Sequence, residues 1–156
     1  MKFTVVAVGR LKEKYWESAC SEYLKRLQPY AKAVVEEVPD IDPAKAGGEA
    51  AAVEREGQAL LKRIPERSRV ILLAIDGKRR SSEDLSRHLD DLALSGTSDF
   101  TFVIGGSCGV SKSVRERADE TLSFGPITLP HNLARVVLLE QLYRACKISH
   151  GEPYHK

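Results

Sequence analysis

The sequence lacks the cysteine patterns that cross-link small domains or hold metal ions. Its three cysteines, Cys20, Cys108 and Cys146, are odd in number and widely spaced, with no CxxC motif and no Cys–His pair at metal-ligand spacing. This distribution argues against a disulfide framework and against a structural zinc site. It predicts a protein without a metal that works in a reducing compartment, the cytoplasm.

Long hydrophobic runs are also missing. The apolar stretch at residues 3–8 is far shorter than the roughly 20 residues that span a bilayer, and no small-residue cleavage site follows it. We expect it to form a strand, and we expect no membrane partner. No low-complexity segment, repeat or linker divides the 156 residues, so the chain is predicted to fold as a single domain covering residues 1–156.

The sequence has little net charge and few aromatic residues. The formal net charge is +2 and aromatic residues make up 6% of the chain, so charge alone would hold free nucleic acid only weakly. Residues 1–32 nevertheless contain seven Lys and Arg against three Glu, whereas residues 33–66 contain eight Asp and Glu against four Lys and Arg. The basic N-terminal segment could face phosphate, although a solvated mixed surface is the simpler interpretation.

The chain does contain a regular alternation of short apolar runs and segments with helical periodicity. The expected strands are residues 2–8, 34–38, 70–75, 100–104 and 127–129. The expected helices are residues 16–27, 42–64, 81–93, 111–118 and 131–147, with Gly47-Gly48 weakening the start of the second. This alternation is typical of an α/β fold with a mostly parallel sheet and helices on both faces. Ligands of such sheets bind beyond the carboxyl ends of the strands, here at residues 76–80, 105–110 and 123–126.

Three glycines, Gly105, Gly106 and Gly109, lie between an expected buried strand and an expected helix. Glycines let the backbone adopt positive φ and approach a ligand closely, although a plain strand–helix turn is the alternative. The loop is not the dinucleotide-binding motif GxGxxG, because Ser107 occupies the second glycine position.

The segment 106–113 is one residue away from a phosphate-binding P-loop, so an NTPase or kinase is an alternative function. Three features count against it. Ser111 replaces the glycine that lets a P-loop wrap the phosphates, the loop does not follow the first strand, and the chain is short for that fold. A non-catalytic α/β interaction domain is a further alternative.

The last expected helix contains four successive apolar residues, 136–139, which point nearly all round its axis. It is therefore buried on more than one side, either as a central core helix or against a second subunit related by a two-fold axis. Glu140 and Arg144 are four residues apart on this helix, so an intrahelical ion pair could hold Arg144 for a phosphate or a base.

The chain ends in the sequence GEPYHK at residues 151–156. Chain ends commonly fray, yet this one carries an aromatic ring and an imidazole behind Pro153. Tyr154 could stack on a nucleic-acid base, and His155 could orient that base or accept a proton.

Four blocks of the sequence resemble one known family. They are FVIGG at 102–106, LPH at 129–131, LEQLYRA at 139–145 and GEPYHK at 151–156. With them, the whole chain is similar to the RlmH family, bacterial methyltransferases of the SPOUT superfamily that act on N3 of a pseudouridine in 23S ribosomal RNA. The resemblance implies a SPOUT-type fold with a C-terminal trefoil knot, S-adenosylmethionine as methyl donor, a homodimer that completes the site, and the assembled ribosome as substrate.

The resemblance implies a set of residues that bind the cofactor: Leu73, Ala74, Gly105, Gly106, Phe124, Gly125, Pro126, Ile127, Thr128 and Leu129. For the base, we expect Arg144 to hold a phosphate or the base carbonyl, and Tyr154 and His155 to shape the base pocket. The chain departs from the family pattern at Cys108 and at Gly125-Pro126, where proline removes a backbone donor. His131 lies near this pocket and is more simply explained as a structural residue.

Overall fold

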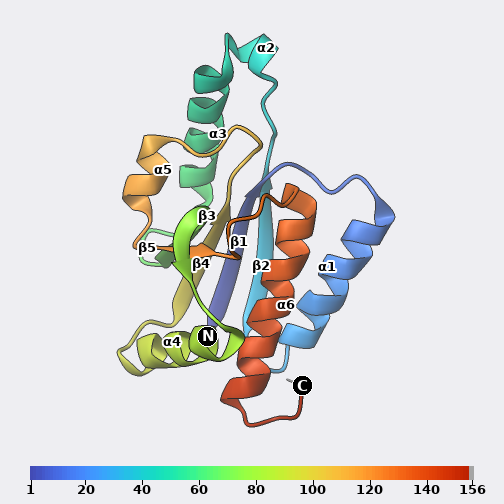
Figure 1. Ribbon diagram of the computed structural model, residues 1–156, viewed down its shortest axis with the longest axis vertical. Helices are drawn as coiled ribbons and strands as arrows, with labels where there is room; N and C mark the ends of the chain where they lie inside the picture. The colour runs from blue at the N-terminus through green and yellow to red at the C-terminus, as the bar shows by residue number, and fades with distance from the viewer. Residues whose placement is uncertain (155–156) are drawn as a thin grey trace.

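A computed structural model describes residues 1–154 of the chain (Figure 1). Its strands are β1 (Lys2–Val8), β2 (Lys32–Val38), β3 (Arg69–Arg79), β4 (Asp99–Ile104) and β5 (Glu120–Ser123). Its helices are α1 (Lys14–Leu27), α2 (Pro43–Ala46), α3 (Glu49–Arg63), α4 (Ser82–Leu94), α5 (Lys112–Arg117) and α6 (His131–Ser149). The predicted alternation of strands and helices is confirmed over most of the chain.

The five strands form one sheet in the order β2-β1-β4-β3-β5, and every neighbouring pair is parallel. The α/β fold class is therefore confirmed, with a sheet that is parallel throughout. Parallel strands require crossover connections, so the carboxyl ends of all five strands lie at one edge of the sheet. This edge is where a ligand is expected in such a fold.

Helices cover both faces of the sheet, as the alternation predicts (Figure 1). Helices α1, α4 and α6 cover one face, and α3 and α5 cover the other. Successive side chains of β1 belong to different cores: Phe3 and Val5 pack under α1, α4 and α6, whereas Val6 and Val8 pack under α3 and α5. Burial on both faces explains why the central strands are continuous apolar runs.

Helix α6 lies between α1 and α4 and is central to its face of the sheet. Leu138, Leu139 and Leu142 are fully buried, and Val136 and Val137 are half-buried. Packing within the chain therefore explains most of the apolar run, as expected of a core helix. A second subunit is not needed to cover these residues, so the homodimer stays a prediction.

The strand predicted at residues 127–129 is wrong. The last strand is β5 (Glu120–Ser123), and residues 124–130 form an irregular bend. Pro126 and Pro130 flank the predicted segment and have no N–H to donate to a strand ladder, and Ile127 is 55% exposed. The apolar residues of this segment therefore do not mark a buried strand.

The single helix predicted at residues 42–64 is also wrong. Helix α2 ends at Ala46 and α3 begins at Glu49, so Gly47 and Gly48 separate the two helices. These two glycines have φ angles of 94° and 124°, which L-residues with side chains rarely adopt, so the helical path is interrupted there.

Strand β3 pairs with β5 twice, on either side of a bulge. Leu73 and Lys78 both lie opposite Leu122, so the residues between them bow out of the ladder. Gly77 lies in this bow, where an added Cβ would be 2.9 Å from the carbonyl carbon of Leu122, so only glycine permits the approach. The end of β3 is thereby held beside the segment that leads to α6. The trefoil knot implied by the family resemblance stays a prediction.

The three cysteines are free thiols. Cys20 and Cys146 are buried and Cys108 is exposed. Burial raises the pKa of the Cys146 thiol to about 11, so this group stays protonated at neutral pH. Over residues 1–154, no helix is both long enough and apolar enough to cross a membrane.

Glu120, at the start of β5, is a carboxylate shared by three basic side chains. Arg69 Nε donates to Oε1 at 2.9 Å, while His88 Nε2 lies 2.6 Å and Arg80 Nη2 3.6 Å from Oε2. The Glu120 side chain is 16% exposed. Burial alone would raise the pKa of this carboxyl, but the hydrogen bond from Arg69 and the charge of His88 outweigh it and lower the pKa.

Glu120→Gln is expected to lower the free energy of unfolding at neutral pH by about 2–3 kcal/mol, because the neighbouring guanidinium groups lose their carboxylate. The folded pKa lies below the unfolded value of about 4.3, so this contribution is fully present above that value. It is lost as the pH falls through the folded pKa. Urea unfolding should therefore show a difference between wild type and variant that shrinks in acid.

The matched control for this prediction is Glu22→Gln, which breaks an exposed ion pair with Arg26. We expect that change to cost less than about 1 kcal/mol at any pH. Equal stability of the Glu120→Gln and Glu22→Gln variants at neutral pH would contradict the assigned role of Glu120.

Candidate functional site

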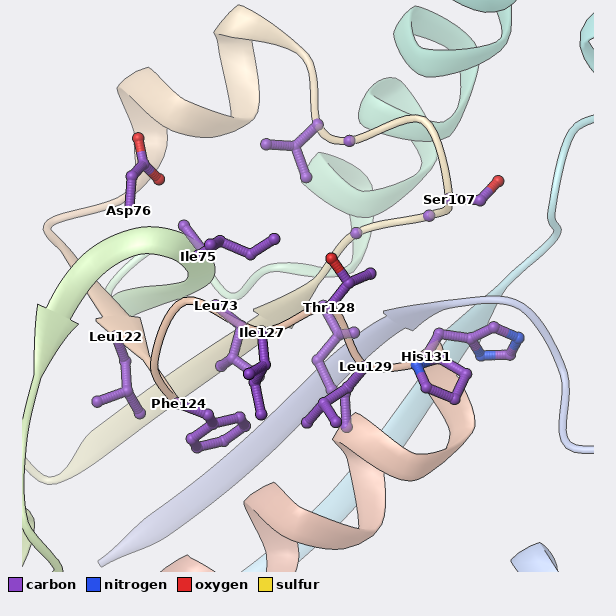
Figure 2. A pocket seen from close by; sticks show the side chains of 18 of the residues that line it. Leu73, Ile75, Asp76, Ser107, Leu122, Phe124, Ile127, Thr128, Leu129 and His131 are labelled. Carbon is purple, nitrogen blue, oxygen red and sulfur yellow. The ribbon is translucent and has the colours of Figure 1, made fainter.

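A cavity of about 820 Å³ lies beyond the carboxyl ends of β3 and β4 (Figure 2). Three segments surround it: the bulged part of β3, the glycine turn at residues 105–110, and the bend at residues 124–130. Nine of the ten residues implied for cofactor binding line this cavity: Leu73, Ala74, Gly105, Gly106, Phe124, Gly125, Ile127, Thr128 and Leu129. Pro126 is exposed and is not part of the lining.

The glycine turn at residues 105–110 is closed by a backbone hydrogen bond and is packed closely. Gly109 N donates to Gly106 O at 3.1 Å, and Gly109 has a φ of 92°. An added Cβ on Gly105 would lie 2.4 Å from Val110 Cγ1, and one on Gly106 would lie 2.6 Å from Glu56 Oε2. A side chain at Gly105 would collide with Val110, and one at Gly106 would displace the Glu56 carboxylate, so backbone groups form this wall of the cavity.

The bend before α6 is held by the side chain of Ser123. The Ser123 hydroxyl donates to Ile75 O at 2.8 Å and accepts from Gly125 N at 3.0 Å. Gly125 has a φ of 107°, which reverses the chain after Phe124. These bonds fasten the bend to the bulged part of β3, so two walls of the cavity are coupled.

The cavity has apolar walls and a polar mouth. Figure 2 shows the side chains of Leu73, Ile127 and Leu129 lying together inside it. At the mouth, Arg115 Nη2 lies 3.7 Å from Asp76 Oδ1 in a solvent-exposed pair. Asp76 belongs to the predicted ligand segment 76–80, because it directly follows an apolar run, but nothing in the sequence distinguishes Arg115 from other surface arginines. Such a cavity suits a ligand with a flat apolar ring and a charged end.

His131 opens α6 at the edge of the cavity. Its ring packs against the end of β1, where an added Cβ on Gly9 would lie 2.7 Å from Cε1. Its Nδ1 is buried and has no hydrogen-bond partner among the described residues. The predicted structural role is consistent with this packing, and the side chain also reaches the cavity.

Arg144, Tyr154 and Glu140 form a cluster at the other end of α6. Arg144 donates to Glu140 Oε1 from Nε at 2.9 Å and from Nη2 at 2.6 Å. The Tyr154 hydroxyl donates to the same oxygen at 3.3 Å, and the Arg144 guanidinium lies 4.6 Å from the centroid of the Tyr154 ring. The predicted ion pair between Glu140 and Arg144 is confirmed.

Electrostatics keep Arg144 and Tyr154 protonated. The hydrogen bond to Glu140 raises the pKa of the Arg144 guanidinium. Burial, followed by the charge of Glu140, raises the pKa of the Tyr154 phenol. Both groups therefore donate hydrogen bonds at neutral pH, and Tyr154 does not serve as a base there.

This cluster does not lie at the cavity of its own chain. An α-helix rises about 1.5 Å per residue, so the thirteen residues from His131 to Arg144 span about 20 Å. Figure 1 likewise places the described C-terminal end at the foot of α6, far from the carboxyl ends of the strands. The structure thus brings Arg144 and Tyr154 together but separates them from the cofactor residues. His155, the third predicted residue, lies outside the described residues.

The P-loop alternative finds no support in the geometry. Lys112, which would bind phosphate, has a side chain that is 90% exposed and pairs with Glu116 on the surface of α5. It is not among the residues that line the cavity. Among residues 1–154, no group of three or more His, Cys, Asp or Glu side chains is placed to hold a metal ion.

Comparison with known proteins agrees with the fold and the cavity. The family described as "Predicted SPOUT methyltransferase" matches residues 1–155, and this match together with the parallel sheet places the chain in the class of SPOUT methyltransferases. Relatives from Listeria welshimeri and Listeria monocytogenes are each 50% identical to the chain, and one from Enterococcus faecalis is 48% identical. All three matches cover 100% of both chains, and all three proteins are named ribosomal RNA large subunit methyltransferase H. The chain belongs to this RlmH family.

Proposed function

We propose that the protein transfers a methyl group from S-adenosylmethionine to N3 of a pseudouridine in 23S ribosomal RNA. It does so on the assembled ribosome, in the cytoplasm and as a homodimer. The names of relatives that match over their whole length support ribosomal RNA as the substrate class. The proposal rests on one observation: the glycine turn and the bend before α6 line the same cavity.

The cavity fits S-adenosylmethionine in size and in chemistry. Its volume of about 820 Å³ lies within the roughly 300–1,000 Å³ typical of small-ligand sites. Apolar side chains such as Leu73 and Leu129 would enclose the adenine, and backbone groups of the glycine turn would lie against the ligand. At the mouth, Arg115 and Asp76 have charges complementary to the carboxylate and ammonium groups of the methionine part.

When bound, S-adenosylmethionine supplies a methyl group on a sulfonium sulfur, and its transfer to N3 breaks the C–S bond while the N3 proton leaves to a base or to water. The residues of the protein would then serve to position the target base against the methyl group. Arg144 would hold a phosphate or the base carbonyl through its planar fork. Tyr154, as a neutral phenol, would stack on the base, and His155 would orient the base or accept the proton.

The distance between the two sets of residues supports the proposed homodimer. Reacting atoms must lie about 3–3.5 Å apart, whereas Arg144 and the cavity edge of the same chain are separated by about 20 Å along α6. An isologous dimer can bring the end of α6 from one subunit to the cavity of the other, because each subunit presents the same surface to its partner. Each site would then combine the cavity of one subunit with Arg144, Tyr154 and His155 of its partner.

Incubation with methyl-labelled S-adenosylmethionine and ribosomes that lack the modification tests the proposed function. We expect label in a single nucleoside that co-migrates with N3-methylpseudouridine after digestion of the 23S RNA. Thr128→Trp is the control, because an indole at this exposed, cavity-lining position would obstruct the cavity without entering the core. Label in another nucleoside would refute the assigned target, and absence of label would refute the activity.

A further inference from the structure

The loop between β1 and α1, together with the first turn of α1, presents cations that the fold does not use. Arg10, Lys12 and Lys14 are all exposed. Within residues 1–154, none of these three side chains forms an ion pair. We call residues 10–16 the basic loop. Its charges are available to an external partner.

The basic loop also carries two aromatic rings. Tyr15 is 65% exposed, although large hydrophobic side chains usually lie inside a folded protein. The Trp16 ring packs beside it, with centroids 5.2 Å apart and planes at 57°. Exposed rings among lysines and arginines are the combination with which proteins hold single-stranded nucleic acid, since bases stack on the rings while cations contact phosphates.

A group of hydrogen bonds around the buried Arg135 side chain, which we call the clamp, fixes the start of the basic loop. Arg135 on α6 is 1% exposed, and its Nη1 donates to Glu37 Oε2 at 2.6 Å while its Nη2 donates to Gly9 O at 3.1 Å. Glu37 Oε2 also accepts from Leu11 N at 3.1 Å. Because a buried guanidinium is costly unless paired, this arrangement holds the start of the loop against α6.

The same clamp sets the loop beside the cavity. Arg135 lies one helical turn after His131, which lines the cavity and packs against Gly9 at the end of β1. Figure 1 shows the loop leaving the sheet at the edge where the strands end. An RNA strand whose target base enters the cavity would therefore have its neighbouring nucleotides near the basic loop.

We propose that the basic loop binds a single-stranded segment of ribosomal RNA next to the target nucleotide. Lys12 and Lys14 contact phosphates, and Tyr15 stacks on a base. Glu13 and Glu17 reduce the net charge of residues 10–17 to +1, so ring stacking contributes alongside charge. This inference rests on the proposed function, because it assumes that the cavity receives a nucleotide of RNA.

The test compares a loop variant, Lys12→Ala/Lys14→Ala, with a control variant, Lys62→Ala/Arg67→Ala. The control removes two exposed cations near the amino ends of the strands, at the opposite edge of the sheet. Methyl transfer to unmodified ribosomes is measured at several KCl concentrations, and the affinity for S-adenosylmethionine by calorimetry. A second assay follows binding of a fluorescent single-stranded RNA, which does not require methyl transfer.

We expect the loop variant to raise the KM for ribosomes about tenfold and to reduce the slope of log(kcat/KM) against log[salt] by about 2, because two lysines no longer neutralise phosphates. Tyr15→Ala should weaken RNA binding about tenfold without changing that slope, because stacking on a ring involves no charge. Leu94→Ala, at another highly exposed apolar residue, should have no effect. The affinity for S-adenosylmethionine should stay at its wild-type value throughout.

Loop and control variants with the same KM, salt slope and RNA affinity would overturn the inference. A loop variant that loses affinity for S-adenosylmethionine, or that dissociates into monomers by light scattering, would also overturn it, because the loop would then serve the cavity or the subunit contact. The proposed function is judged separately, by whether the wild-type protein labels ribosomes. If it does not, the RNA-binding assay still decides whether the basic loop holds RNA.

Discussion

Arg144→Ala is expected to lower kcat for methyl transfer about 100-fold while leaving the Kd for S-adenosylmethionine unchanged. Loss of one well-placed donor to a reacting group typically has an effect of this size. Arg144 is well placed because Glu140 binds two of its nitrogens and the Tyr154 ring lies against its guanidinium. Cofactor affinity should not change, because Arg144 is proposed to hold the RNA and is not among the residues that line the cavity. Rapid-quench transfer to ribosomes and calorimetry measure the two quantities.

Two further variants show whether this effect belongs to the reaction. Arg144→Lys keeps the charge but loses the planar fork and its stacking, so only partial recovery of kcat is expected. Arg63→Ala breaks an exposed ion pair with Glu36 on the other face of the sheet and should retain wild-type kcat. If Arg144→Ala instead lowered cofactor affinity by the same factor as kcat, or gave a protein with a clearly lower melting temperature than wild type, Arg144 would be a structural residue.

Elements whose signals are local could be predicted from the sequence. The apolar runs at 70–75 and 100–104 are strands, because a strand covered on both faces needs apolar residues throughout. The predicted helices at 81–93 and 111–118 both begin at a serine. Ser81 and Ser111 each accept a hydrogen bond from a backbone N–H three residues later, at Asp84 and Val114, as helix caps do.

Elements decided by a distant partner could not be predicted in this way. Strand β5 has the sequence Glu-Thr-Leu-Ser, which contains no apolar run, and it is a strand because β3 pairs with it. The continuation of β3 beyond residue 75 has the same cause. The sequence Asp76-Gly77 is typical of a turn, but in the folded protein Gly77 packs against the backbone of Leu122. Tertiary pairing outweighs local propensity at both places.

The candidate site likewise has parts that local sequence signals predict and parts that depend on distant residues. The glycine turn was predictable, because it follows the apolar run at 100–104 of a parallel sheet. The residues of the bend before α6 came from the family resemblance, whereas the apolar pattern predicted a strand at 127–129. The separation of Arg144 from the cavity was not, since it depends on the direction in which α6 runs over the sheet. The clamp between Glu37 and Arg135 joins residues 98 positions apart, and no periodicity in the sequence indicates it.

A tagged heterodimer tests whether each site combines two subunits. One subunit carries Arg144→Ala and keeps an open cavity, and the other carries Thr128→Trp and keeps Arg144. Each homodimer should be nearly inactive, because each lacks one half of both sites. If cavity and Arg144 come from different subunits, the heterodimer contains one intact site and should regain about half of the wild-type activity.

The reciprocal pairing should give the opposite result and is the control for this recovery. A wild-type subunit paired with a subunit carrying both Arg144→Ala and Thr128→Trp has no intact shared site, because the wild-type cavity faces Ala at position 144 of its partner. Its activity should therefore be nearly absent, whereas sites confined to single chains would leave about half. Activity that follows this second pattern would show that each site is confined to one chain and would refute the shared site. The two heterodimers contain the same substitutions in different subunits, so overall stability and cofactor supply cannot account for a difference between them.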